Sequence, residues 1–79
     1  MRLREVLALN LRKLRRARGI SQEDLAHQAD LDRTYISALE RSVYAASVDV
    51  VERLAAVLDV EATDLLSEPN RRPFSKEAS

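Results

Sequence analysis

The fold of this chain is decided by residues 19–41, which read GISQEDLAHQADLDRTYISALER. Ser21 followed three positions later by Asp24 is a capping-box signature, and it predicts that a helix starts here. After a short break, Asp32 can cap a second helix by accepting hydrogen bonds from the first amides of that helix. The stretch therefore predicts two short helices joined by a tight turn.

The segments on both sides of this stretch also have helical patterns. Before it, apolar residues recur every three or four positions, as on one face of a helix, and Gly19 supplies the stop. After it, Ser47 can cap a further helix with a similar stripe, and a short helical turn is expected at residues 63–66. The two stripes consist of Leu3, Val6, Leu7, Leu11 and Leu14, and of Val48, Val51, Leu54, Ala55 and Leu58. We therefore predict an all-α fold of five helices, in which residues 1–67 form one domain and residues 68–79 form a flexible tail.

The composition limits what such a domain can do. The 79 residues carry zero net charge and contain no cysteine, and no apolar run approaches the roughly 18 residues that cross a membrane. His27, the single histidine, makes no zinc site without cysteine, and a chain this short offers little depth for a catalytic pocket. The N-terminus does not have the pattern of a signal peptide. We therefore expect a cytoplasmic protein that is not an enzyme and that uses no metal, cofactor or small-molecule ligand.

The zero net charge conceals an uneven distribution. Residues 1–41 hold nine basic and six acidic residues, whereas residues 42–79 hold four basic and seven acidic residues. A dipolar domain of this kind can turn its basic end towards a polyanion. The alternative is that helical surfaces simply carry many charges.

The outward face of the helix after Asp32 suits contact with DNA. Ile36 and Leu39 point inward, and the polar residues, together with Ala38, lie on the opposite face or on its flanks. A helix fits the major groove of B-DNA, where a guanidinium suits guanine, a methyl group suits thymine and hydroxyls suit either base. Tyr35 could instead pack against the preceding helix. The expected base-reading residues are Arg33, Thr34, Tyr35 and Ser37.

The stretch at residues 19–41 resembles the helix-turn-helix core of the lambda repressor/Cro-like (XRE-type) family. The resemblance rests on the pattern SQExLA at residues 21–26 and the pattern YISxLER at residues 35–41, and it extends from about Leu11 to Leu66. Within the family, the chain most resembles small stand-alone regulators such as the controller proteins of restriction–modification systems. The resemblance implies a compact five-helix DNA-binding domain.

The resemblance also implies roles for individual residues. Gln22 matches a glutamine that typically binds a DNA phosphate, at a helix start whose amides can face the same phosphate. Arg41 would reach the DNA backbone, and the base-reading residues match positions that contact bases or phosphates in the family. Arg15 and Glu40 match a pair that family members commonly join across the core, and our interpretation of the spacing agrees.

The segment after Arg41 departs from the family pattern. Family members usually have a glycine and then basic residues here, whereas residues 42–47 read SVYAAS and contain neither. The hydroxyls of Ser42 and Tyr44 could still contact phosphate. Because the charge is missing, we expect DNA affinity to depend less steeply on salt than in basic members. The apolar part of this loop packs either on the core of the domain or on a partner.

Dimerisation is expected because one recognition helix contacts only a few base pairs, so specificity requires two copies on a two-fold symmetric site. The expected dimer surface is the acidic C-terminal half, which holds more apolar residues than two short helices need for one core. These residues could instead close the core of the monomer. The candidates are Val57, Val60, Leu65 and Leu66.

The sequence thus predicts a transcriptional regulator that binds double-stranded DNA sequence-specifically as a homodimer. Two alternatives use the same fold. A protein-interaction module that has lost DNA binding is favoured by the neutral net charge and the uncharged loop. An antitoxin could contact its toxin through residues 67–79 and bind DNA only to regulate itself.

Overall fold

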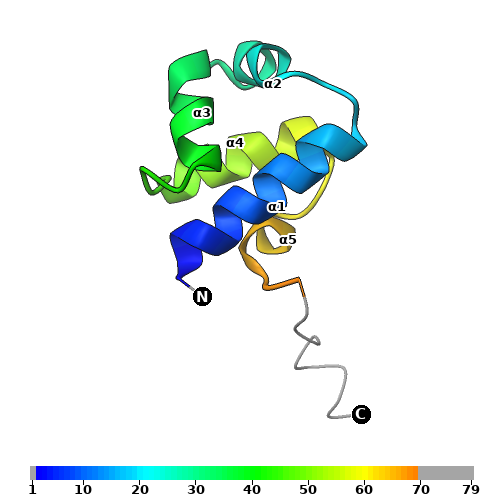
Figure 1. Ribbon diagram of the computed structural model, residues 1–79. Coiled ribbons are helices and arrows are strands. Elements are labelled where there is room, and N and C mark those ends of the chain that lie inside the picture. The colour runs from blue at the N-terminus through cyan, green and yellow to red at the C-terminus, as the bar shows by residue number, and fades with distance from the viewer. Residues whose placement is uncertain (1, 70–79) are drawn as a thin grey trace.

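The computed structural model describes residues 2–69, and within them the chain forms five helices and no strand (Figure 1). The predicted helix-turn-helix lies at one end of the molecule and the last helix at the other, with the first and fourth helices between them. The all-α, five-helix prediction is confirmed. The predicted tail lies outside the described residues, apart from positions 68 and 69. The helices are α1 (Leu3–Ala17), α2 (Gln22–Ala29), α3 (Arg33–Glu40), α4 (Val48–Leu58) and α5 (Ala62–Leu66).

Three polar side chains start helices at the positions that the sequence predicts. Ser21 Oγ accepts a hydrogen bond from the Asp24 amide at 3.0 Å, and Asp24 Oδ2 accepts one from the Ser21 amide at 3.2 Å. Asp32 Oδ1 accepts from the amide two residues later at 3.1 Å, and Ser47 Oγ accepts from the amide three residues later at 3.2 Å. Each of these bonds satisfies an amide that has no partner within its own helix.

The turns after α1, α2, α3 and α4 share one backbone design, a single residue in the left-handed region. In each turn, the amide after that residue donates to the carbonyl five residues earlier, over 2.8 to 3.3 Å, as in a Schellman motif. The apolar residue that supplies this amide packs against the core after α1, α2 and α4, whereas Val43 after α3 is 49% exposed. The left-handed residues are Gly19, Asp30, Ser42 and Asp59, with φ of 70°, 59°, 62° and 58°.

The core consists of large aliphatic side chains from all five helices. Two stripe residues that the sequence assigns to it lie outside, since Leu3 is 60% and Val48 is 77% exposed. Each is the first residue of its helix, where the side chain projects past the elements that cover the later turns. The largest fully buried side chains include Leu11, Leu25, Ile36, Leu39, Leu54, Leu58 and Leu65.

Ala38 is buried, with 4% exposure, and the prediction that it lies on the outward face of α3 is wrong. The Val43 amide donates to the Ala38 carbonyl at 2.9 Å, so the chain folds back over the end of α3. Ala38 therefore lines a shallow hollow that it shares with Tyr35 and Tyr44. Helical periodicity describes α3 alone, so it does not predict that the following turn covers Ala38.

Candidate nucleic-acid interface

The residues predicted to read bases lie in the first turns of α3. Arg33 and Thr34 are exposed, while Tyr35 and Ser37 are half-buried. Within residues 2–69, the Arg33 guanidinium has no hydrogen bond or ion pair. The carboxylate of Asp32 accepts a hydrogen bond from the Thr34 amide, so part of its charge is used at the start of its own helix. The arrangement leaves Arg33 and Thr34 available to an external partner.

Tyr35 lies between the core and the loop that follows α3. Its ring packs against the core cluster on one side, and its centroid lies 6.3 Å from that of Tyr44, with 35° between the two planes. Val43 is 49% and Tyr44 56% exposed, so packing on the core, one of the two alternatives for this loop, does not hold for these residues. It holds for Ala46, which is packed against the core. The loop thus forms an apolar, aromatic edge beside the recognition helix.

The residues predicted to contact phosphates surround α3. Gln22 is the first residue of α2 and is half-buried, Arg41 is exposed directly after α3, and Ser42 is half-buried. Gln22 Nε2 donates to Glu40 Oε1 at 3.0 Å, a contact that the sequence did not indicate. Gln22 and Arg41 come from opposite ends of the motif, so phosphate contacts from both would fix the register of α3.

Arg15 and Glu40 form a buried ion pair between α1 and the last turn of α3. Arg15 Nε donates to Glu40 Oε2 at 2.6 Å, and Arg15 Nη2 donates to Glu40 Oε1 at 3.1 Å. The exposed fractions are 9% for Arg15 and 3% for Glu40. The hydrogen bonds to Glu40 and its negative charge raise the pKa of the Arg15 guanidinium above its ordinary value, although burial acts in the opposite direction. Arg15 is therefore a structural residue and is not available to a phosphate.

Polar side chains of α1 and α4 hold the ends of other helices, in contacts that sequence reasoning did not single out. Arg12 Nη1 donates to the Glu40 carbonyl at 2.8 Å, and Arg53 Nη1 donates to the Ala29 carbonyl at 3.2 Å. The buried Asn10 side chain donates to the Leu65 and Ser67 carbonyls at 3.0 and 2.8 Å. Of these contacts, the sequence could have indicated that of Asn10. Asn10 lies next to Leu11 in an apolar stripe, where a buried polar side chain needs a hydrogen-bond partner.

The four candidates for the dimer surface do not share one environment. Leu65 is fully buried and belongs to the core, so its assignment to a dimer surface is wrong. A five-residue helix packed against α1 and α4 turns that side chain inward. Val57, Val60 and Leu66 are partly buried and pack against the core with part of their surface.

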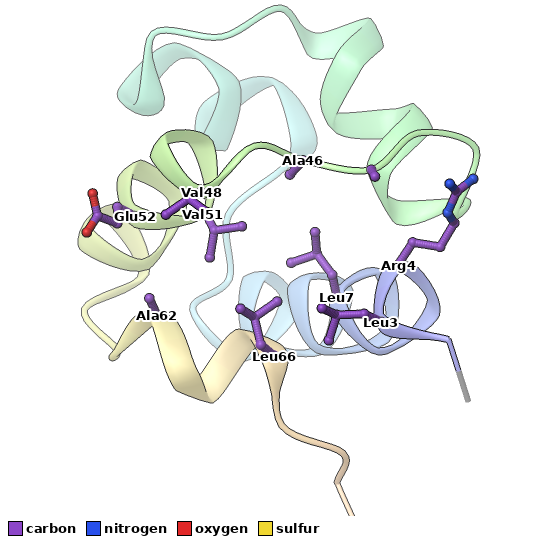
Figure 2. A pocket seen from close by; sticks show the side chains of 10 residues that line it. Leu3, Arg4, Leu7, Ala46, Val48, Val51, Glu52, Ala62 and Leu66 are labelled. Carbon is purple, nitrogen blue, oxygen red and sulfur yellow. The ribbon is translucent and has the colours of Figure 1, made fainter.

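An apolar hollow of about 240 Å³ opens between the start of α1, the start of α4 and α5 (Figure 2). Leu3 and Val48, the two exposed residues at the starts of their helices, lie on it together with Leu66. Arg4 and Glu52 are its charged lining residues. The hollow therefore combines an apolar lining with two exposed apolar side chains.

Among residues 2–69, no group of three histidine, cysteine, aspartate or glutamate side chains could hold a metal ion. His27 is exposed on α2. In the same part of the chain, no helix has the length and apolar character of a membrane-spanning helix.

A family model described as helix-turn-helix matches residues 11–65. The matched range runs from the middle of α1 into α5, so it includes the whole of α2 and α3. The charged network between α1 and α3 therefore lies inside the matched region.

Individual relatives agree with this match to the helix-turn-helix family. The chain is 49% identical over 70 residues to a hypothetical transcription factor of Neisseria meningitidis, covering 89% of this chain but 66% of the relative, slightly under two thirds. It is 38% identical over 65 residues to control protein C.BamHI of Bacillus amyloliquefaciens, covering 81% of this chain and 80% of the relative. The crystal structure of the restriction–modification controller protein C.AhdI from Aeromonas hydrophila superposes with a TM-score of 0.76 at 39% identity, covering 78% of this chain and 94% of that chain.

Proposed function

Because the chain belongs to the helix-turn-helix family of DNA-binding transcription regulators, we propose that it binds a two-fold symmetric operator in double-stranded DNA as a homodimer. The relatives named above are a transcription factor and two controller proteins. A regulator of this type acts on genomic DNA in the cytoplasm. This family membership agrees with the resemblance seen in the sequence.

The observation that carries the proposal is the free, capped start of α3. Arg33 and Thr34 are exposed there, and the Asp32 cap holds the first turn in helical geometry. In the major groove, the Arg33 guanidinium would bind guanine O6 and N7, and the Thr34 methyl group would contact a thymine methyl. Tyr35 and Ser37, both half-buried, would present their hydroxyls to a base or to a neighbouring phosphate.

The proposed phosphate contacts flank this helix. Gln22 would bind a phosphate with its side-chain amide and the first amides of α2, which have no partner within the helix. Arg41 would bind with its guanidinium, and Ser42 and Tyr44 with their hydroxyls. Because only Arg41 among these four carries a charge, few counterions would be released and the affinity should fall only moderately with salt.

The dimer would form on the face that carries the apolar hollow. Val48 and Leu3 are exposed there and Leu66 lines the hollow, and the partly buried Val57 and Val60 would add to the interface. A two-fold dimer is self-complementary, so an exposed side chain beside a hollow can enter the same hollow on the partner. No residue of α2 or α3 lines the hollow, so a dimer formed there would leave the outward face of both recognition helices free.

The test is binding to a pool of random DNA duplexes at two salt concentrations, with sequencing of the bound fraction. We expect a two-fold symmetric motif that weakens as salt is raised. Arg33→Ala should lose about 1–3 kcal/mol of binding free energy and relax the preference at one base in each half-site. Lys13→Ala removes the same charge from the exposed face of α1 and should leave the base preference unchanged. An unsymmetrical motif would refute the dimer, and folded protein with no enriched sequence would refute the regulator.

A protein-interaction module is the second candidate, and the exposed Val43 and Tyr44 beside α3 favour it. Such a module would recover no DNA motif and would bind its partner equally well after Arg33→Ala. The two candidates therefore give opposite results in one experiment.

A further inference from the structure

Glu40, the last residue of α3, accepts hydrogen bonds from two other helices. Its carboxylate receives Arg15 Nε and Nη2 from α1 and Gln22 Nε2 from α2, and its backbone carbonyl receives Arg12 Nη1. The side chain is 3% exposed. The last residue of the recognition helix therefore holds the first residue of the preceding helix directly.

The contact fixes which way the Gln22 amide faces. An ionised carboxylate only accepts hydrogen bonds, so the glutamine must turn its nitrogen, not its oxygen, towards Glu40. That nitrogen carries two hydrogens, and the bond to Glu40 Oε1 at 3.0 Å uses one of them. The second hydrogen stays available at a position set by the buried carboxylate.

The ion pair with Arg15 makes this arrangement compatible with an anion. A lone carboxylate beside a DNA phosphate would repel it, but the Arg15 guanidinium donates two hydrogen bonds to the same carboxylate and cancels its charge. At this helix start, the second N–H of the Gln22 side chain and the first amides of α2 can donate, beside the exposed carboxylates of Glu23 and Asp24.

We propose that Glu40 is a positioning residue for DNA binding, which holds the Gln22 amide ready to donate to a phosphate and so couples the core ion pair to the DNA backbone. The inference rests on the proposed function, because it assigns a device to one contact of that function. A free glutamine would lose its side-chain freedom on binding, and holding it beforehand avoids this loss. The expected gain in affinity is about two- to tenfold.

The first experiment is a double-mutant cycle in DNA binding. Arg15→Leu with Glu40→Leu removes the carboxylate and its partner together, so that no buried charge is left alone. If Glu40 acts through Gln22, this apolar pair should weaken DNA binding about two- to tenfold in the wild-type background but leave it unchanged in the Gln22→Ala background. An equal loss in both backgrounds would show that the pair only maintains the fold, and would overturn the proposal.

A second measurement uses the unmodified protein and does not depend on any variant folding. The side-chain amide hydrogens of Gln22 are compared by NMR with those of Gln28, which is exposed on the same helix. We expect one Gln22 hydrogen to be shifted and slow to exchange before DNA is added, and the other to shift when DNA binds. If the Gln22 hydrogens behave like those of Gln28, Glu40 does not position the Gln22 amide.

The outcomes separate this inference from the proposed function. Wild-type protein that enriches no duplex refutes both. Protein that loses its base preference on Arg33→Ala but shows no coupling between Gln22 and Glu40 retains the function and refutes only the positioning role.

Discussion

Gly19 and Ser42 adopt the same left-handed backbone, with φ of 70° and 62°, at equivalent points of the turns after α1 and α3. Glycine adopts this conformation freely, whereas a side chain there meets the backbone and costs about 1 kcal/mol. Ser42 occupies the place where the related family usually has glycine. The turn beside the recognition helix is therefore the more strained of the two.

Ser42→Gly should raise the free energy of unfolding by about 0.5–1 kcal/mol, because it relieves this strain. Urea unfolding followed by circular dichroism measures the change. Ser47→Gly is the control, since Ser47 has an ordinary φ of −73° and caps α4, so this variant should be slightly less stable than wild type. A Ser42→Gly protein no more stable than wild type would show that the turn is unstrained.

Glu40→Ala should lower the free energy of unfolding by about 3–5 kcal/mol, since it leaves the buried Arg15 guanidinium without its carboxylate partner and with only the Ile20 carbonyl as acceptor. Arg15→Leu with Glu40→Leu should stay within about 1 kcal/mol of wild type because no charge is stranded. Urea unfolding measures both variants, with Glu23→Ala on the exposed face of α2 as control. A loss below about 1 kcal/mol on Glu40→Ala would mean that the pair is solvated.

The same pair predicts how stability depends on pH. The pKa of Arg15 is raised in the folded state. The stability that the ion pair contributes is therefore fully present at pH values below the pKa of Arg15 in the unfolded chain. It is lost only as pH rises through the pKa in the folded protein. Both values lie far above neutrality. The difference in unfolding free energy between wild type and Glu40→Ala should therefore be the same at about pH 7 and about pH 9. A difference that shrinks over this interval would contradict the assignment.

Asn10→Ala should weaken the attachment of α5, because the Asn10 amide donates to the carbonyls of Leu65 and Ser67 near the end of that helix. The expected loss is about 1–3 kcal/mol of unfolding free energy. Relative to wild type, hydrogen exchange of the backbone amides in the variant should accelerate more in residues 62–66 than in α2. Uniform acceleration in both helices would mean that α5 does not open separately.

The parts of this structure that follow from local rules were predictable. Ser21, Asp32 and Ser47 cap the helices that follow them because a cap needs only the two or three residues next to it. Periodicity assigned Leu11 and Ile36 correctly to the core. Such features depend on neighbours along the chain.

Features that depend on what lies across the fold were not predictable in the same way. Leu3 and Val48 continue their stripes, but no other element covers the first residue of either helix. Arg12 resembles its solvated neighbours until the end of α3 is placed within 2.8 Å of it. At the site, the sequence indicated the position of Gln22 and the pairing of Glu40, but not the hydrogen bond between them.

Tyr44→Phe should weaken binding to the selected DNA by about 0.5–1.5 kcal/mol and leave stability unchanged, since it removes only the hydroxyl proposed to contact phosphate. Tyr44→Ala should weaken binding further, because the ring 6.3 Å from that of Tyr35 is lost and Tyr35 is less well held. Fluorescence anisotropy with the selected duplex measures both. Equal affinity of all three proteins would exclude the loop from the DNA interface.

Val48→Lys should weaken dimerisation at least about tenfold, because it places a charge at the apolar hollow between α1, α4 and α5. Val48 is 77% exposed, so the monomer loses little packing and its unfolding free energy should change by less than about 0.5 kcal/mol. Sedimentation equilibrium measures the dissociation constant. Val43→Lys is the matched control, since Val43 is 49% exposed beside the helix-turn-helix and should leave the dimer intact. If the Val43 variant dissociates and the Val48 variant does not, the two protomers contact each other beside the recognition helix. The dimer interface would then not lie at the hollow.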